Sequence, residues 1–285
     1  GHQRRASSAG PNIVNYLKVD VLRPEVELKV VLAQDTVVGR ERVSSMAWRS
    51  EAIAAVNGAF FAQDGRPLGL FAIDGELISE PYARRTAIGL GPDLAIIDAV
   101  DFRGTARLGD GREYSITGIN RPRLQDDLIV YTSRYGESTR TNIYGCEVVL
   151  IDGIVVEAAV GNAVIPPGGM VLSGHGTARD FLTDVQVGDA VEVEIVLDPD
   201  WFALGVQQII GGGPRLVRDG EVHITGEAER FQRDVLEGRA PRTALGFTAD
   251  HKLLLVTVNG RQPGVSVGMT LTELAELMLE LGAVN

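Results

Sequence analysis

The sequence contains a single cysteine, Cys146, few aromatic residues and no long apolar run. One cysteine cannot form an internal disulfide, and no CxxC or HExxH pattern occurs, so disulfide scaffolds and thiolate zinc sites are excluded. Aromatic residues make up only 6% of the chain, which argues against extended stacking platforms for bases or sugars. The longest aliphatic stretches, such as Leu253–Val256, fall far short of the roughly 20 residues needed to cross a bilayer.

Basic residues are also in the minority. Lys and Arg total 27 against 38 Asp and Glu, which gives a formal net charge of −11 over 285 residues. Because such an acidic surface repels nucleic acid and anionic membranes, we expect neither as a partner. The short apolar runs predict no transmembrane segment. No signal or transit peptide is visible, but the chain begins at Gly1 rather than Met, so an export signal could have been removed.

Glycine is abundant, with 34 residues that are dispersed rather than periodic, which favours many tight turns. Six Asp-Gly or Asn-Gly pairs punctuate apolar runs and are typical of hairpin turns: Asp64–Gly65, Asp74–Gly75, Asp110–Gly111, Asp152–Gly153, Asp219–Gly220 and Asn259–Gly260. A helix is predicted after Thr270, which has capping-box spacing to Glu273, and a second over residues 227–236. We therefore predict an α+β fold with few helices, built on a β-rich mixed sheet or a barrel-like core.

Residues 1–10 have no hydrophobic periodicity and are predicted to form a disordered tail or tag remnant, followed by one domain over 11–285. Within it, the sequence of Arg84–Leu90 returns in similar form at Pro241–Phe247. This similarity suggests an internal duplication in which two Arg-Thr corners face a common centre. The alternative is chance similarity between short strand motifs.

Two glycine-containing strand ends are candidate ligand sites. Val56–Phe61 contains Asn57-Gly58, which exposes main-chain amides where a ligand can approach, although an ordinary hairpin turn fits equally. Gly211–Gly213 follows an apolar strand but lacks the Gly-Lys-Ser/Thr ending of a P-loop. A proline follows it rather than a helix, so nucleotide binding is disfavoured, whereas the approach of a phosphate or a sugar stays open.

Three arginines, Arg85, Arg242 and Arg261, lie next to turns or strand ends. A guanidinium offers a planar fork of donors for phosphate or carboxylate oxygens, although each could equally be a solvated surface residue. His175, in a Ser-Gly-His-Gly segment, is the candidate catalytic imidazole, with an ordinary loop residue as the alternative. No pair of carboxylates can be singled out by spacing as a glycosidase dyad.

Taken together and in order, these motifs resemble the phosphodiester glycosidase family. The resemblance rests on Leu17–Asp20, Val56–Phe61, Arg85–Gly89, Gly211–Val217, Pro241–Gly246, Val258–Gln262 and Ser266–Ala275. The segment from about 104 to 204 matches less clearly, and we expect it to be a β-rich insertion.

The chain departs from the family pattern in two places. Ala59 stands where the family has glycine, and the chain ends at Asn285, where the family continues into Asn-Leu-Asp-Gly-Gly-Gly-Ser. We therefore expect the domain to be truncated at its C-terminal end and the catalytic carboxylate to lie in that further segment.

The resemblance implies hydrolysis of a sugar-1-phosphodiester to a free sugar and a phosphomonoester. It implies catalytic roles for Arg85 and Arg242, while His175 stays a catalytic candidate from its own segment. It also implies substrate binding by Asn57, Gly58, Phe61, Thr86, Gly211, Gly212, Gly213, Thr243, Asn259 and Arg261. Two alternatives remain: a non-catalytic carbohydrate- or cell-wall-binding module, and a hydrolase of an exopolysaccharide or cell-wall glycan on the same scaffold. No metal is firmly implied, although dispersed aspartates could bind Ca²⁺. Export or the cell envelope is favoured over the cytoplasm.

Overall fold

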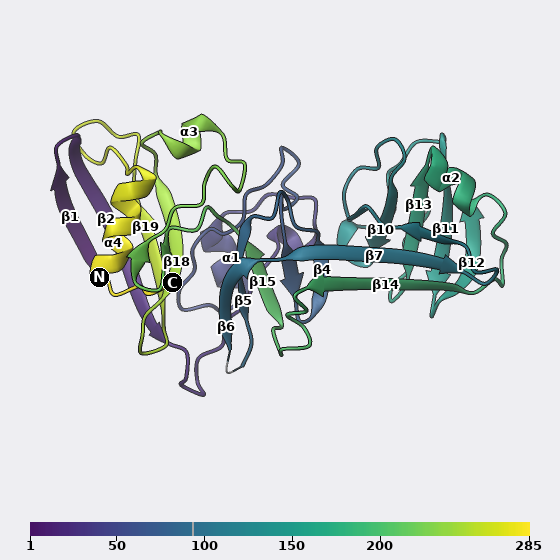
Figure 1. The fold of residues 1–285 in the computed structure, drawn as a ribbon, viewed down its shortest axis with the longest axis horizontal. Coiled ribbons are helices and arrows are strands. Elements are labelled where there is room, and N and C mark those ends of the chain that lie inside the picture. Colours follow the sequence, from purple (N-terminus) through teal and green to yellow (C-terminus); the bar gives the residue numbers. More distant parts are fainter. Residues whose placement is uncertain (93) are drawn as a thin grey trace.

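The computed structural model describes residues 1–92 and 94–285, which form three β-rich parts in a row (Figure 1). We call them the terminal sheet, which lies beside both chain ends, the central sheet, and the lobe at the far end. The described residues form nineteen strands, four α-helices and two short 3-10 helices, and none of their sheets closes into a barrel. The predicted α+β fold with few helices is confirmed, in its mixed-sheet rather than its barrel-like form.

The terminal sheet is antiparallel and has the order β1-β2-β19-β18. Its strands are β1 (His2–Ser7), β2 (Gly10–Asp20), β18 (Arg242–Phe247) and β19 (Lys252–Val258). The apolar face of helix α4 (Leu271–Glu280) packs in one buried cluster with residues of β2, β18 and β19. The capping box predicted for this helix is present, with the Thr270 hydroxyl accepting from the Glu273 N–H and the Glu273 carboxylate accepting from the Thr270 N–H. The predicted C-terminal helix is therefore confirmed.

The first ten residues differ from the expected tail. Residues 2–7 form β1, which pairs with residues 10–15 of β2. Side-chain burial alternates along β1 between exposed and intermediate, as in an edge strand with one face on the protein. Hydrophobic periodicity does not predict this strand because its partly buried side chains, such as Gln3 and Arg5, are polar.

The central sheet is antiparallel and has the order β4-β3-β15-β5-β6. Its strands are β3 (Phe71–Ile73), β4 (Glu76–Ser79), β5 (Thr86–Leu90), β6 (Ala95–Ala99) and β15 (Gln208–Gly211). A 3-10 helix (Ala33–Asp35) and α1 (Val43–Arg49) precede it in the chain. Because β15 lies between β3 and β5, the glycine run that follows β15 lies beside the start of β5.

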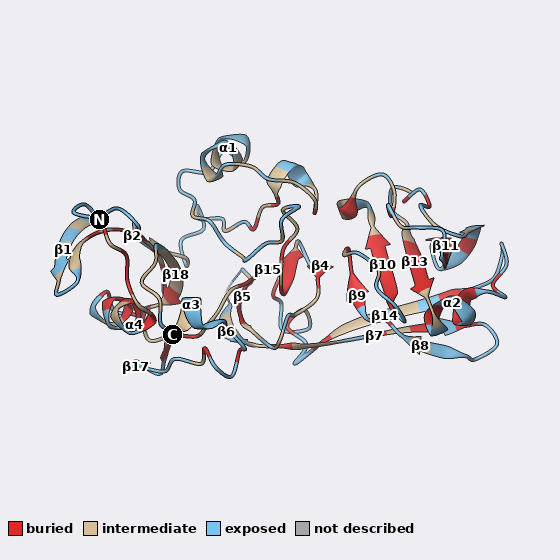
Figure 2. Ribbon diagram, turned by 90° about the horizontal axis from the view of Figure 1, so that it is seen from above, coloured by how far each residue is buried: buried red, intermediate tan, exposed pale blue. Residues whose placement is uncertain are grey.

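The lobe contains a mixed sheet of order β12-β11-β13-β10-β9, in which only β9 and β10 are parallel. Its elements are β9 (Gly118–Ile119), β10 (Leu128–Thr132), a 3-10 helix (Ser133–Tyr135), β11 (Gly145–Ile151), β12 (Ile154–Ala159), β13 (Met170–His175) and α2 (Thr177–Leu182). Figure 2 shows that buried residues concentrate on the strands of the lobe and central sheets, with exposed loops around them.

One long ribbon carries the chain into and out of the lobe. Strands β7 (Asp101–Leu108) and β14 (Val191–Asp198) pair along their whole lengths, and β8 (Glu113–Ser115) pairs with β7 near its lobe end (Figure 1). Residues 109–190 therefore leave and rejoin the ribbon at neighbouring positions. They lie within the segment expected to be an insertion, and their status as an insertion in the family stays a prediction.

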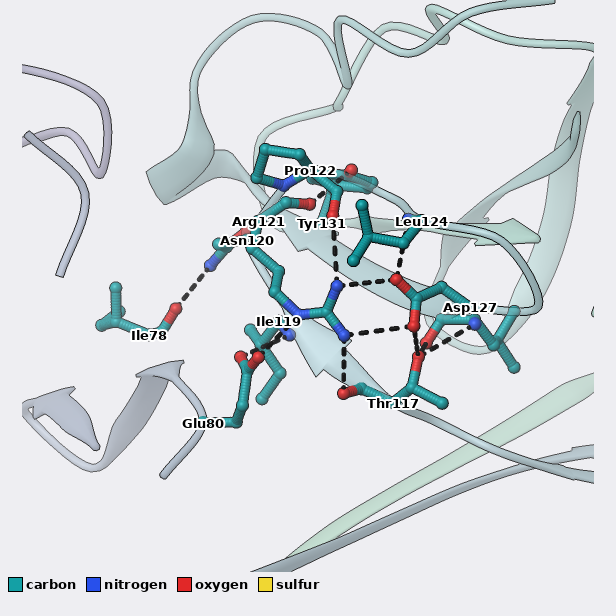
Figure 3. A network of polar contacts seen from close by, with 11 residues as sticks. Ile78, Glu80, Thr117, Ile119, Asn120, Arg121, Pro122, Leu124, Asp127 and Tyr131 are labelled. Carbon is teal, nitrogen blue, oxygen red and sulfur yellow. Dashed lines mark hydrogen bonds and ion pairs between the residues drawn. The ribbon is translucent and has the colours of Figure 1, made fainter. Parts of the chain in front are cut away.

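A polar network joins the lobe to the central sheet (Figure 3). The Glu80 carboxylate accepts hydrogen bonds from the Ile119 N–H at 2.9 Å and from Arg121 Nε at 2.7 Å. Arg121 also pairs with Asp127 at 2.7 Å, and the Asn120 amide donates to a carbonyl of β4 at 3.1 Å. A buried cluster that contains both Phe71 of β3 and residues of β10, β11 and β13 lies at the same junction. The lobe is thus packed on the central sheet as well as tethered to it.

Four of the six predicted hairpin turns connect paired strands: Asp74–Gly75, Asp110–Gly111, Asp152–Gly153 and Asp219–Gly220, the last between β16 (Val217–Arg218) and β17 (Glu221–Val222). Asp64–Gly65 lies between the bridged residues Phe61 and Pro67. Asn259–Gly260 follows β19 and joins no pair of strands, so the hairpin expected there is wrong. The helix predicted over 227–236 is reduced to α3 (Arg233–Leu236).

Candidate functional site

A cavity of about 430 Å³ lies between the central and terminal sheets, with walls from β5, β15, β18 and α4. It gathers nine of the thirteen predicted site residues: Asn57, Gly58, Phe61, Thr86, Gly211, Gly212, Gly213, Arg242 and Thr243. These residues come from four separate chain segments. Arg85, His175, Asn259 and Arg261 are not among the residues that line it.

The glycine run forms one wall. The Gly212 N–H donates to the Thr86 carbonyl at 3.0 Å, so the run continues the contact between β15 and β5. Gly213 has a φ of +81°, and a Cβ atom there would lie 2.1 Å from a carboxylate oxygen of Glu229, so this position needs glycine. In the described part of the chain the Gly213 N–H donates no hydrogen bond. It is a main-chain donor that a bound anion could use.

Arg242 begins β18 and is half-buried at the opposite wall. Its Nε donates to the Met269 carbonyl at 3.1 Å, and one Nη donates to the carbonyls of Val235 and Gly238 at 3.0 and 2.7 Å. Burial lowers the pKa of Arg242; the charge of Asp234 opposes this shift, and the charge of Arg261 adds to it. A guanidinium nevertheless stays protonated at neutral pH, so Arg242 is a fixed positive charge at the cavity.

Arg85 lies just outside the lining, beside Thr86. Its guanidinium carbon is 3.9 Å from the ring centre of Phe231, 4.8 Å from that of Tyr82 and 5.6 Å from that of Phe60, which lines the cavity. Its Nε donates to the Glu229 carbonyl at 3.3 Å, and burial lowers its pKa. Arg85 is thus an aromatic-packed cation behind the Phe60 side of the cavity.

The remaining predicted residues lie elsewhere. Asn259 and Arg261 are exposed in the loop after β19, although Arg261 is close enough to Arg242 to affect its pKa. His175 ends β13 in the lobe, where it pairs with Gly145 and its N–H donates to the Asp127 carbonyl at 3.0 Å. Its Nδ1 is buried with no hydrogen-bond partner in the described residues. The flanking glycines resemble a flexible loop, but the residue is in a strand and is not brought to the cavity.

No sequence motif identifies Glu229 as part of the site, yet its side chain lies directly behind Gly213 and the residue is only 4% exposed. The helical reading of 227–236 would place it on a turn of a surface helix, where a glutamate is ordinary. Its burial could be found only by knowing that this segment crosses behind the glycine run. In the described structure no aspartate or glutamate lines the cavity itself.

Residues 53–59, the last three of which line the cavity, form few hydrogen bonds with the rest of the protein. Among the described residues, no main-chain hydrogen bond involves residues 53–59, and Ile53 is fully exposed. The Thr243 hydroxyl donates to Asn57 Oδ1 at 2.6 Å and so ties this segment to β18 across the cavity. Gly58 packs so closely on Ile210 that a Cβ atom would lie 2.1 Å from its Cδ1.

Replacing Thr243 by valine removes this hydrogen bond while keeping the side-chain shape. Because one such bond contributes about 1 kcal/mol, we expect chymotrypsin to cleave after the exposed Phe60 and Phe61 about five times faster than in the native protein. Thr257→Val, opposite Thr243 in the same strand pair and without a side-chain hydrogen bond, is the matched control. Equal cleavage of all three proteins would show that the bond does not hold the segment.

A second cavity, of about 850 Å³, lies beyond Arg215, which lines both. None of the thirteen predicted site residues is among the described residues that line it. The first cavity is therefore the candidate site.

Residues 1–92 and 94–285 contain no group of three or more His, Cys, Asp or Glu side chains arranged to hold a metal ion. In the same residues, no helix combines the length and apolar character required to span a membrane.

Known proteins resemble the chain in sequence and in fold. The model of the phosphodiester glycosidase family matches residues 144–285. No curated protein matches the chain. A hypothetical protein from Synechocystis aligns over 100% of this chain and 54% of its own, with a TM-score of 0.85 and 22% identity. A candidate exported protein from Burkholderia pseudomallei K96243 aligns over 96% of this chain and 66% of its own, with a TM-score of 0.84 and 27% identity.

The chain thus spans between about half and two thirds of the length of these two structures. The catalytic domain of zebrafish N-acetylglucosamine-1-phosphodiester α-N-acetylglucosaminidase aligns over 100% of this chain and 67% of its own, at 16% identity, with a TM-score of 0.48 that is too low to carry an argument. The family match contains Gly211–Gly213 and Arg242–Thr243, and the fold brings Asn57–Phe61 and Thr86 to them from outside it. Over residues 144–285, just under half of the chain, the sequence is similar to the phosphodiester glycosidase family.

Proposed function

We propose that this protein hydrolyses sugar-1-phosphodiesters. Water attacks the anomeric carbon, the bond from that carbon to the phosphate oxygen breaks, and the products are a free sugar and a phosphomonoester. One proton of the water is lost to solvent as the phosphomonoester forms. The family match supports this class of reaction, and the positive charge at the cavity supports its substrate.

The observation that carries the proposal is a pair of half-buried guanidiniums without carboxylate partners. In the described residues neither Arg85 nor Arg242 forms an ion pair, although the chain has a net charge of −11. Carbonyl oxygens and aromatic rings stabilise these two cations without neutralising them, so their positive charge stays available to a bound anion. A phosphodiester is such an anion, and an arginine fork matches its oxygens.

The roles follow from position. The Gly213 N–H and Arg242 would hold the phosphate, and Arg85 would add charge from behind Phe60. Because phosphate is a good leaving group, holding its developing charge in place matters more than strong acid catalysis. Asn57 and the exposed face of Phe61 would contact the sugar.

The test is a panel of methyl esters of sugar-1-phosphates alongside the corresponding methyl glycosides, given to the protein in its natural full length. We expect release of reducing sugar and methyl phosphate from the diesters only. Hydrolysis of the glycosides instead would favour a glycan hydrolase on the same scaffold. If neither class is hydrolysed, the proposed reaction is wrong.

One observation favours the second candidate, a carbohydrate-binding module: no carboxylate lines the cavity in the described residues. Isothermal calorimetry with the same diesters separates the two, because a binding module retains the ligand intact. We also propose an exported or cell-envelope location, which the fold similarity to a candidate exported protein supports. Fractionation of the source cells would test it.

A further inference from the structure

We propose that Glu229 is a positioning residue of this site, which holds the glycine run and the start of β5 so that their donors face the bound anion. The inference rests on the proposed function for its substrate. It concerns a carboxylate that lies behind the cavity wall, outside the set of residues that the motifs identify.

Each oxygen of the Glu229 carboxylate is engaged. Oε2 accepts from the Thr86 N–H at 2.9 Å. Oε1 accepts from the Thr86 hydroxyl at 2.7 Å, from the Arg215 N–H at 3.0 Å and from the Thr225 hydroxyl. Because Glu229 is only 4% exposed, these four donors replace the water that its carboxylate would otherwise bind.

Three of these donors, from Thr86 and Arg215, belong to two walls of the cavity. Thr86 begins β5, and Arg215 closes the turn that contains Gly213. One rigid carboxylate therefore fixes the separation of two segments that are more than a hundred residues apart in the chain. In addition, the main-chain carbonyl of Glu229 accepts from Arg85 Nε at 3.3 Å, so the same residue also orients the aromatic-packed guanidinium.

The same contacts argue against Glu229 as the reacting group. A nucleophile or general base needs an oxygen within reach of the substrate or of its water. Gly213 lies between this carboxylate and the cavity, and both carboxylate oxygens are occupied by protein donors. Glu229 acts through the main chain it holds.

Glu229→Gln is the main variant. An amide has one acceptor oxygen, and if that oxygen serves the three donors around Oε1, its NH₂ group must face the Thr86 N–H. This donor-to-donor contact pushes the two walls apart. Since a displacement of about 1 Å can cost about 100-fold in rate, we expect kcat/KM for a sugar-1-phosphate methyl ester to fall 10- to 100-fold.

Two further variants serve as a control and as a milder test of the same contacts. Glu227→Gln changes an exposed carboxylate two residues away that forms no side-chain hydrogen bond within the described part of the chain, and should behave as the native protein. Thr225→Val removes one donor from Oε1 without changing the cavity lining, and should lower kcat/KM about threefold to tenfold. It keeps the test usable if Glu229→Gln does not fold.

A separate measurement distinguishes positioning from simple stability. We expect inorganic phosphate to bind the native protein and Glu227→Gln equally, and to bind Glu229→Gln at least tenfold more weakly at a temperature where circular dichroism shows both folded. Added azide or formate should not restore activity to Glu229→Ala, because no reacting carboxylate is missing. Restoration by either anion, with formation of the sugar azide or formate ester, would overturn the positioning role.

The outcomes separate this inference from the proposed function. Native phosphate binding without hydrolysis of any diester refutes the proposed reaction alone, and the binding series still tests Glu229. Equal phosphate binding and equal kcat/KM in Glu229→Gln and the native protein overturn the inference alone. A native protein that neither binds phosphate nor hydrolyses diesters overturns both.

Discussion

Replacing Arg242 by alanine is expected to lower the rate of sugar release from a sugar-1-phosphodiester by about 100- to 1000-fold, the usual cost of losing one preorganised donor at developing negative charge. Arg242 lines the cavity, and three main-chain carbonyls fix its guanidinium in place. A donor held this rigidly does not reorganise as the phosphate takes up charge. Its loss should therefore appear mainly in kcat.

The same three carbonyls give the variant a second phenotype. Because Met269, Val235 and Gly238 would lose their donor, we expect unfolding free energy to fall by about 1–3 kcal/mol. Comparing rates well below the melting transition separates the two effects. Arg230→Ala is the control, because it removes an exposed arginine whose side chain has no hydrogen-bond or ion-pair partner among residues 1–92 and 94–285. An Arg242→Ala protein that releases sugar within twofold of the native rate would remove Arg242 from the mechanism.

Replacing Glu147 of β11 by alanine is expected to lower the stability of the lobe strongly, because this glutamate is completely buried. Its two oxygens accept four hydrogen bonds of 2.6–3.0 Å, from the hydroxyls of Thr139, Thr141 and Ser173 and the N–H of Ala163. The guanidinium of Arg123, whose side chain is 2% exposed, lies 3.8 Å away. Glu147→Ala would leave that cation buried without its countercharge, which costs about 3–5 kcal/mol.

Amide hydrogen exchange at Val148 and Leu172, which are paired across β11 and β13, is the appropriate measurement because it reports on the lobe alone. Glu157→Ala, on the exposed side of neighbouring β12, should change exchange by less than about 0.5 kcal/mol. If exchange in Glu147→Ala stays within 1 kcal/mol of the native value, taken as about a fivefold change in rate, the cluster does not stabilise the lobe.

The sequence predicts those parts of the fold that depend on local chemistry. The capping box at Thr270 and the Asp152–Gly153 turn are determined within a few residues, and both occur where expected. It fails where an element depends on distant partners. Strand β1 forms because β2 offers it an edge, and the helix expected from Glu227 begins only at Arg233 because Glu229 turns inward to Thr86 and Arg215.

For the candidate site too, the sequence identifies individual residues but not how they are arranged in space. The glycine run and the Arg-Thr corners could be identified because an uninterrupted run of glycines and a repeated short motif are visible in the sequence itself. That Thr86 and Thr243 line one cavity, whereas His175 lies in the lobe, depends on how the sheets are packed, which no local pattern records. The sequence likewise cannot separate Arg242, which lines the cavity, from Arg261, which is exposed beside it.

The ribbon of β7 and β14 has a consequence for how the architecture can vary. Leu108 and Val191 face each other at its far end, so a two-residue turn would close the ribbon in place of all the residues between them. Such an excision leaves every strand of the candidate site in its register. It would, however, uncover Phe71 and Ile78, which pack against the lobe. The chain connection therefore allows the lobe to be deleted, but the loss of its packing would expose apolar side chains. A shortened relative would need polar residues at positions 71 and 78.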